Sequence, residues 1–377
     1  MSAKPDPFPT VAKLGRECHA SWPSYKAAAK ETARIEGILR EVLPKRRLLD
    51  SDSSLVLCGS FARWEMVNGS DLDWTLLIDG IVKNEHAQTA RTIHEALQKG
   101  EKKGLKSPGS SGTFGNMAFS HDLVHRIGGG ADSNENLTRR ILLLLESRPL
   151  SLSLDNSPDQ VWTSVLKAIL ERYFEEDVHF STSSPGKVPR FLLNDITRYW
   201  RTICVDYAAK HREQDGAKWA IRNAKIRFSR KLLYAAGLAF CFRCQLNPPQ
   251  EQYPLLDPKL GGNGAGPFIA AAVDFAQTPP LEYLAIFIDQ NVKKSKKRQK
   301  ISNLIFGAYN EWLRILGDDK KRAALTNLSH EYADKDPTFA TIRRKGEEFA
   351  RGLKLLFFNR EEDTDETANL SLEYVGF

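Results

Sequence analysis

The stretch GSFARWEMVNGSDLDWTLLI, residues 59–78, places two aspartates at the start of a mostly apolar run. Asp71 and Asp73 are two positions apart, and the residues that follow them are rich in strand-forming types. Aspartate is depleted in strands, so two of them at the start of one need an explanation. Residues i and i+2 of a strand point to the same face. The pattern therefore predicts a strand over residues 71–78 with both carboxylates side by side at its beginning.

This pair of carboxylates indicates a divalent cation. Two negative charges that close repel each other unless a cation lies between them, and one carboxylate would be enough for a turn. Magnesium takes hard oxygen ligands, typically one or two carboxylates together with substrate phosphates. Asp71 and Asp73 are therefore the predicted metal ligands, with two Mg²⁺ ions expected and Mn²⁺ as an alternative.

A phosphate site is predicted just upstream, at Gly59 and Ser60. The apolar run 54–58 predicts a strand and residues 61–66 a short helix, so the Gly-Ser pair lies at a strand-to-helix junction. Glycine lets the backbone approach a ligand closely, N–H groups at the start of a helix bind phosphate, and Ser60 offers a hydroxyl donor. A phosphate site next to a metal site is the layout for attack on a nucleoside triphosphate.

Residues 54–78 resemble the signature of the polymerase β-like nucleotidyltransferase superfamily: an apolar strand, Gly-Ser, a spacer, and Asp-x-Asp in a second strand. Arg63 and Glu65, followed by Ser-Asp-x-Asp, are similar to the PII-uridylyltransferase and glutamine-synthetase adenylyltransferase group, whose motif commonly reads Gly-Arg-Gly-Glu and then Ser-Asp-x-Asp. The later run NLTRRILLLLESR, residues 136–148, is also similar to the helix that follows the catalytic strands in that group.

The resemblance covers residues 54–150 and implies nucleotide-binding roles for Gly59, Ser60 and Arg63. Trp64 departs from the pattern, because that group often has glycine at this position. The chain is also too short for the hydrolase and ligand-sensing domains of a PII uridylyltransferase. We therefore expect a stand-alone relative with a different acceptor.

The superfamily usually supplies a third carboxylate from a neighbouring strand, and Asp122 is the candidate. The run NMAFSHDLVHRI, residues 116–127, predicts a strand that contains this aspartate, although a surface aspartate on an edge strand is the alternative interpretation. Asp132 is the second choice. His121 and His125 are not assigned a metal, because residues four apart in a strand are too far apart to share one ion.

A helix in the second half of the chain is expected to contact the triphosphate. Residues 225–231, KIRFSRK, place Lys225 and Ser229 at near-helical spacing, with Phe228 and Leu232 on the buried side. Superfamily members often direct a lysine and a serine from such a helix to the triphosphate, so the resemblance implies nucleotide binding by Lys225 and Ser229. A basic, solvated helix face is the alternative.

The composition is that of an ordinary globular chain: 377 residues, 41% hydrophobic and 27% charged. No run reaches the roughly eighteen apolar residues of a membrane span, the N-terminus lacks the apolar core of a secretory signal, and five scattered cysteines fit a reducing compartment. We expect a cytoplasmic protein without membrane contact.

The apolar periodicity predicts an α+β fold with two domains. A small mixed-sheet nucleotidyltransferase head, with an N-terminal helix at 24–43, occupies residues 1–150, and an all-helical nucleotide- and acceptor-binding domain occupies 151–377. The further predicted helices are 84–99, 137–147, 161–177, 190–210, 221–244, 301–316 and 336–358.

The net charge of +7 is compatible with a polyanionic partner. One dense basic run, KKSKKRQK, is the candidate contact for such a partner, although most runs of this kind are solvated surface. Its cationic residues are Lys293, Lys294, Lys296, Lys297, Arg298 and Lys300.

Together these features predict a Mg²⁺-dependent enzyme that transfers a nucleoside monophosphate from an NTP to a hydroxyl acceptor on a protein, RNA or nucleotide, with release of pyrophosphate. Asp122 would bind the acceptor-side metal or act as the base. One alternative is a cGAS-like cyclic-oligonucleotide synthase, although those usually carry Thr where this chain has Glu65. The other is a catalytically silent nucleotide- or RNA-binding module. Retention of both Asp71 and Asp73 favours the enzyme.

Overall fold

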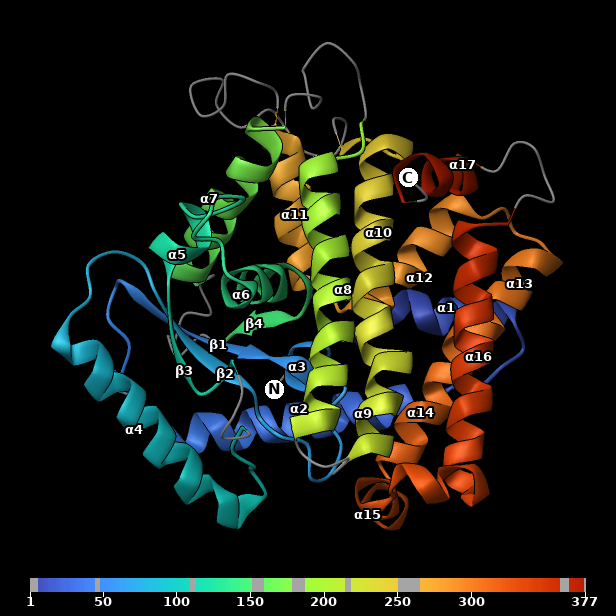
Figure 1. Cartoon of the computed structure of the whole chain (residues 1–377), viewed down its shortest axis with the longest axis horizontal. Helices are drawn as coiled ribbons and strands as arrows, with labels where there is room; N and C mark the ends of the chain where they lie inside the picture. Colours follow the sequence, from blue (N-terminus) through green and yellow to red (C-terminus); the bar gives the residue numbers. More distant parts are fainter. Residues whose placement is uncertain are drawn as a thin grey trace. The chain divides into compact units, whose positions relative to one another are not determined.

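The computed structural model divides the chain into two compact units, each built from separate stretches of sequence. Figure 1 labels the helices and strands that form them. Unit 1 comprises Met1–Ala28, Gly186–Pro248 and Pro280–Phe377, and unit 2 comprises Ala29–Pro185 and Pro249–Pro279. The residues described by the structure are 6–44, 48–108, 113–150, 159–177, 187–213, 218–249, 265–359 and 366–375.

Unit 2 contains a four-stranded mixed sheet in the order β3-β2-β1-β4. β1 pairs antiparallel with β2 and with β4, whereas β2 pairs in parallel with β3. Leu57 lies opposite Trp74, and Ser53 lies opposite Ile78, so the two apolar runs pair along their whole length. The strands are β1 (Ser53–Cys58), β2 (Trp74–Ile78), β3 (Asn116–Phe119) and β4 (Ser147–Pro149).

Helices cover both faces of this sheet, which explains why β1 and β2 are buried at every position. On one face, Leu57 and Trp74 share a core with Leu39 of α2 (Pro23–Val42) and Ile93 of α4 (Asn84–Gly100). On the opposite face, the hydroxyl of Ser54 donates to Asp159, the residue that caps α7, at 2.7 Å. This two-sided burial accounts for the continuous apolar runs in the sequence.

The remaining helices of unit 2 follow the predicted periodicity closely. The predicted helices at 24–43, 84–99, 137–147 and 161–177 are confirmed within a few residues. Besides α2 and α4, the helical elements described in unit 2 are α3 (Gly59–Ala62), the 3₁₀ turn Glu101–Lys103, α5 (Ser120–Val124), α6 (Asn134–Leu145), α7 (Gln160–Glu175) and α11 (Gly266–Gln277).

Unit 1 is helical in its described residues. Two π-helical segments, Ile226–Arg230 and Asn303–Gly307, interrupt predicted continuous helices. The α-helices are α1 (Pro9–Glu17), α8 (Arg190–Glu213), α9 (Trp219–Lys225), α10 (Lys231–Leu246), α12 (Pro280–Asn291), α13 (Lys296–Ser302), α14 (Ala308–Leu316), α15 (Asp319–Asn327), α16 (Pro337–Phe357) and α17 (Glu366–Tyr374), with a 3₁₀ segment at His330–Lys335.

The first helix of unit 1 is capped from a distant part of the chain. The backbone N–H groups of Thr10 and Val11 donate to the two carboxylate oxygens of Glu282 at 2.7 and 3.1 Å. Glu282 is 3% exposed, and burial raises the pKa of its carboxyl above the ordinary value. The N-terminal segment is thereby bonded to α12.

The mixed α and β composition agrees with the predicted fold class, but the units differ from the predicted domains. The first 28 residues group with the helical unit, while α7 and α11 group with the sheet. The reason is packing, since α7 contacts β1 and β2 and α11 contacts α6 and α7. A boundary near residue 150 would separate the sheet from helices that cover it.

Candidate functional site

The Gly-Ser turn follows β1 directly. α3 begins at Gly59, whose φ of 65° lies in the left-handed region. Glycine adopts this conformation at little cost, whereas an L side chain there is strained. Ser60, the next residue, is half-buried and donates its hydroxyl to Sδ of Met66 at 3.1 Å. The backbone at this turn therefore requires a glycine.

Asp71 and Asp73 lie just before β2, which begins at Trp74 and not at Asp71 as predicted. Asp73 still extends the strand pairing, because its carbonyl accepts from the N–H of Cys58 at 2.9 Å. Leu72 and Trp74 are each 1% exposed, whereas both aspartates are partly exposed. This alternation places the two carboxylates on one side of the chain, opposite the core.

The fold brings the turn and the carboxylates into contact. A Cβ atom at position 59 would lie 2.7 Å from Oδ2 of Asp73, a separation that real Cβ atoms essentially never show. The Asp73 carboxylate thus occupies space that only a glycine at position 59 leaves open. Two signals that are separate in the sequence form one site in the structure.

Asp71 also contacts a lysine that sequence reasoning missed. Nζ of Lys106 lies 3.0 Å from Oδ1 of Asp71, and the two side chains are 59% and 40% exposed. The N–H of Leu72 donates to the carbonyl of Lys106 at 2.8 Å, which holds the two segments together. No local motif marks this lysine, because the contact is made by a segment that follows α4. An exposed ion pair of this kind contributes little to stability.

Arg63, for which the resemblance implies nucleotide binding, is buried. Its Nε lies 2.8 Å from Oε2 of Glu65, and its Nη1 contacts the carboxylate of Glu146, the residue that ends α6. The Arg63 side chain is 8% exposed, and the two glutamates are 2% and 0% exposed. Arg63 therefore links the end of α3 to the end of α6 through a buried ion pair.

Trp64, the departure from the family pattern, has a left-handed backbone. Its φ is 60°, a conformation that is strained for a bulky residue and suits glycine. The guanidinium of Arg148 lies over its ring, 4.1 Å from the centroid, and also over the ring of Phe61, 4.2 Å from that centroid. Burial lowers the pKa of Arg148 to about 10. The stacking offsets the backbone strain at a position where the resembling group uses glycine.

The predicted strand around Asp122 is wrong beyond Phe119. β3 ends there, and Asp122 lies in α5, where it forms an ion pair with Arg126 at 3.0 Å. Short apolar runs do not distinguish strand from helix by periodicity alone. The ion pair is partly exposed and follows ordinary i,i+4 helical spacing.

The same correction applies to His121 and His125, which were predicted to lie in a strand. His121 lies in α5, His125 is the residue that caps its C-terminal end, and the two ring centroids are 5.2 Å apart. Across the part of the chain that the structure describes, no three His, Cys, Asp or Glu side chains form a group that could hold a metal ion. Asp122 therefore does not join Asp71 and Asp73 in a three-carboxylate site among those residues.

Asp132, the second choice for a third carboxylate, belongs to a buried ion pair. Its two carboxylate oxygens accept from Nη1 and Nη2 of Arg140 at 3.1 and 3.0 Å. Arg140 is fully buried and also donates to the hydroxyl of Tyr173 at 2.6 Å. This bidentate geometry makes Asp132 a structural residue of unit 2.

Lys225 and Ser229 lie in unit 1. Phe228 and Leu232 are 0% exposed, which confirms the predicted buried side of this helix. Ser229 is itself 6% exposed and lies within the π-helical segment, whereas Lys225 is exposed at the end of α9. The Gly-Ser turn and the two aspartates belong to unit 2.

The basic run at 293–300 contains one buried residue, Arg298, which therefore cannot join the predicted polyanion contact; for the other cations that contact stays a prediction. Arg298 is 6% exposed, lies 3.0 Å from Oε2 of Glu17 and contacts Asp289, because its guanidinium joins α13 to α1 and α12. The exposed cations of the run are Lys293, Lys294, Lys296 and Lys300.

No protein-family model matches the chain, and no curated protein matches it. Among the helices that the structure describes, none is long and apolar enough to cross a membrane. The geometry at Gly59, Asp71 and Asp73 is therefore the feature that indicates a function.

Proposed function

We propose that the protein is a Mg²⁺-dependent nucleotidyltransferase that transfers a nucleoside monophosphate from an NTP to a hydroxyl acceptor. The observation that carries this proposal is the contact between the Asp73 carboxylate and Gly59. It makes the expected phosphate-binding turn and the carboxylate pair neighbours in one unit. The acceptor is a hydroxyl of a protein, an RNA or a nucleotide, and the last of these includes cGAS-like synthesis.

The donor set at this site fits magnesium. Asp71 and Asp73 present two carboxylates on one side of the chain, and Mg²⁺ commonly uses one or two carboxylates plus phosphate oxygens and water. The absent Cβ at Gly59 lets the Asp73 carboxylate lie directly against the Gly-Ser turn. When bound, magnesium or manganese would neutralise charge on the triphosphate and acidify the acceptor hydroxyl.

The chain's own groups orient the triphosphate. Gly59 permits close approach of a phosphate to the backbone, and the half-buried Ser60 hydroxyl can turn from Met66 to a phosphate oxygen. Lys106 is exposed and only loosely bound to Asp71, so it can exchange to the phosphate as the nucleotide arrives.

Such positioning and charge stabilisation account for most of the catalysis in phosphoryl transfer. The acceptor oxygen forms a bond to the α-phosphorus while the bond from that phosphorus to the bridging oxygen breaks. Pyrophosphate leaves, and the hydroxyl proton passes to water.

A catalytically silent nucleotide-binding module is the second candidate, and one observation favours it. No third His, Cys, Asp or Glu side chain joins the two aspartates among the described residues. A site with two acids would hold one magnesium–nucleotide complex more readily than the two metals of full catalysis.

The deciding experiment measures transfer from each α-labelled NTP to total RNA or protein in the presence of Mg²⁺. Asp71→Asn and Asp73→Asn each remove one charge and keep the side-chain shape, so each should lose about a hundredfold in rate, or roughly 2.7 kcal/mol. Asp79→Asn is the matched control, since this exposed aspartate follows the other end of β2. Circular dichroism checks folding.

Full activity in either Asp71→Asn or Asp73→Asn would contradict the proposed mechanism. A wild type that binds Mg²⁺–NTP and transfers nothing to any acceptor would support the silent module instead.

A further inference from the structure

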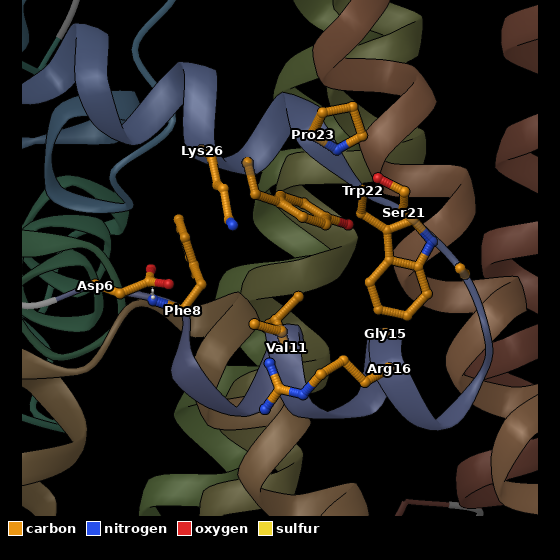
Figure 2. A pocket seen from close by; sticks show the side chains of 12 residues that line it. Asp6, Phe8, Val11, Gly15, Arg16, Ser21, Trp22, Pro23 and Lys26 are labelled. Atoms are coloured by element: carbon orange, nitrogen blue, oxygen red, sulfur yellow. Dashed lines mark hydrogen bonds between the residues drawn. The ribbon is translucent and has the colours of Figure 1, made fainter.

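A pocket lies in unit 1 between α1 and the start of α2 (Figure 2). Its volume is about 450 Å³, which falls in the range of roughly 300–1,000 Å³ that holds small molecules. Its lining residues lie between Asp6 and Lys26, so the pocket is contained in a single unit. Nothing in the proposed nucleotidyltransferase site involves this region.

Three aromatic side chains form the walls of the pocket. Phe8 and Tyr25 are 4% and 2% exposed, while Trp22 is half-buried, and Figure 2 shows Phe8 and Trp22 toward opposite ends of the cavity. The Tyr25 hydroxyl donates to the carbonyl of Phe306, and the Trp22 and Phe306 rings lie 5.5 Å apart. Because Phe306 anchors two of the three walls, the pocket is preformed.

Two cationic side chains line the same space. Arg16 comes from α1, and Lys26 points from α2 toward Phe8 (Figure 2). Both are exposed, and among the described residues neither has an acidic partner. The acid of the described lining, Asp6, is already an acceptor for the N–H of Phe8 at 2.9 Å. The pocket therefore combines aromatic surface with a net positive charge.

We propose that this pocket binds a small planar aromatic anion, with its ring against the aromatic walls and its anionic group on Arg16 and Lys26. Offset or edge-to-face ring contacts favour an aromatic ligand. Charge-assisted hydrogen bonds from a guanidinium and an ammonium favour a carboxylate, sulfonate or phosphate. An aromatic cation would meet two like charges.

The test compares an anion with its neutral analogue of the same shape. Titration calorimetry on the full chain uses 2-naphthoate and 2-naphthamide as probes. The wild type should bind 2-naphthoate at least tenfold more tightly, and the double variant Arg16→Gln/Lys26→Gln should lose that preference. Lys30→Gln, an exposed lysine one turn beyond Lys26 on α2, should retain it.

A second pair of variants tests the location without removing any charge. Ala12 lines the pocket, so Ala12→Phe should fill it and abolish binding of both probes. Ala27→Phe adds the same ring at an exposed position outside the lining and should leave binding unchanged. Equal binding of the two probes by the wild type, or undiminished binding by Ala12→Phe, would overturn the proposal. These two readouts remain decisive if the charge variant fails to fold.

Discussion

Replacing Gly59 by alanine tests the geometry of the candidate site most directly. Two separate penalties are expected. The left-handed φ of 65° costs a non-glycine residue about 1–2 kcal/mol. In addition, the new Cβ would lie 2.7 Å from Oδ2 of Asp73, whereas ordinary contacts begin at 3.4 Å. The carboxylate must therefore move by roughly 0.7 Å, and displacements near 1 Å at a reacting centre can cost about a hundredfold in rate.

Gly80→Ala is the matched control for this substitution. Gly80 follows β2 and has a φ of 115°, so alanine is strained there too, but nothing lies within 4 Å of its Cβ position. Both variants should lose about 1–2 kcal/mol in free energy of unfolding, measured by urea denaturation. Only Gly59→Ala should also lose nucleotidyl transfer and weaken Mg²⁺–NTP binding. If the two variants transfer nucleotide equally well, the Gly59–Asp73 contact has no functional role.

Three further predictions concern the free energy of unfolding of variants in the two units. Trp64→Gly should be more stable than Trp64→Ala by about 1–2 kcal/mol in urea unfolding, because both lose the ring but only glycine relieves the left-handed backbone; equal stabilities would refute the strain. Asp132→Asn should cost about 3–5 kcal/mol, since it removes one charge from a buried ion pair with Arg140. Asp122→Asn should cost under about 0.5 kcal/mol, because its ion pair is partly exposed; similar losses would contradict the assigned roles. The raised pKa of Glu282 means that the folded state holds this proton more tightly than the unfolded state. The stability that Glu282 contributes is thus fully present below the ordinary pKa of 4.5 and is lost as pH rises through the folded-state pKa. The stability of the wild type relative to Glu282→Gln should therefore fall as pH rises through that window. A stability difference that stays constant in thermal unfolding from pH 4 to 7 would rule this out.

Local sequence signals predicted the elements around the site well. Gly59 marks a backbone conformation that other residues rarely adopt, and the apolar run ending at Ile78 is the strand that the pattern indicates. The helices α2 and α4 were predictable because each is long enough for the period of 3.6 residues to emerge. In contrast, residues 116–127 form a run too short to separate strand from helix, and they divide into β3 and α5.

Features that depend on contacts between distant segments could not be predicted. Lys106 reaches Asp71 through pairing between a loop and the residues before β2. Arg63 forms a buried ion pair with Glu146 at the end of α6, a residue 83 positions away in the sequence. A pattern in one stretch of sequence contains no information about which charged residue another stretch will place beside it.

The cap on α1 has a consequence for biosynthesis. Thr10 and Glu282 are 272 positions apart, and at about 5–20 residues per second the ribosome adds the glutamate roughly 15–50 s after the threonine. Unit 2 ends at Pro279, so every segment of the sheet-containing unit is synthesised before Glu282. The N–H groups of Thr10 and Val11 therefore lack this cap until all of unit 2 has been synthesised. Unit 1 can complete its fold only after α12 and the helices that follow it have been translated.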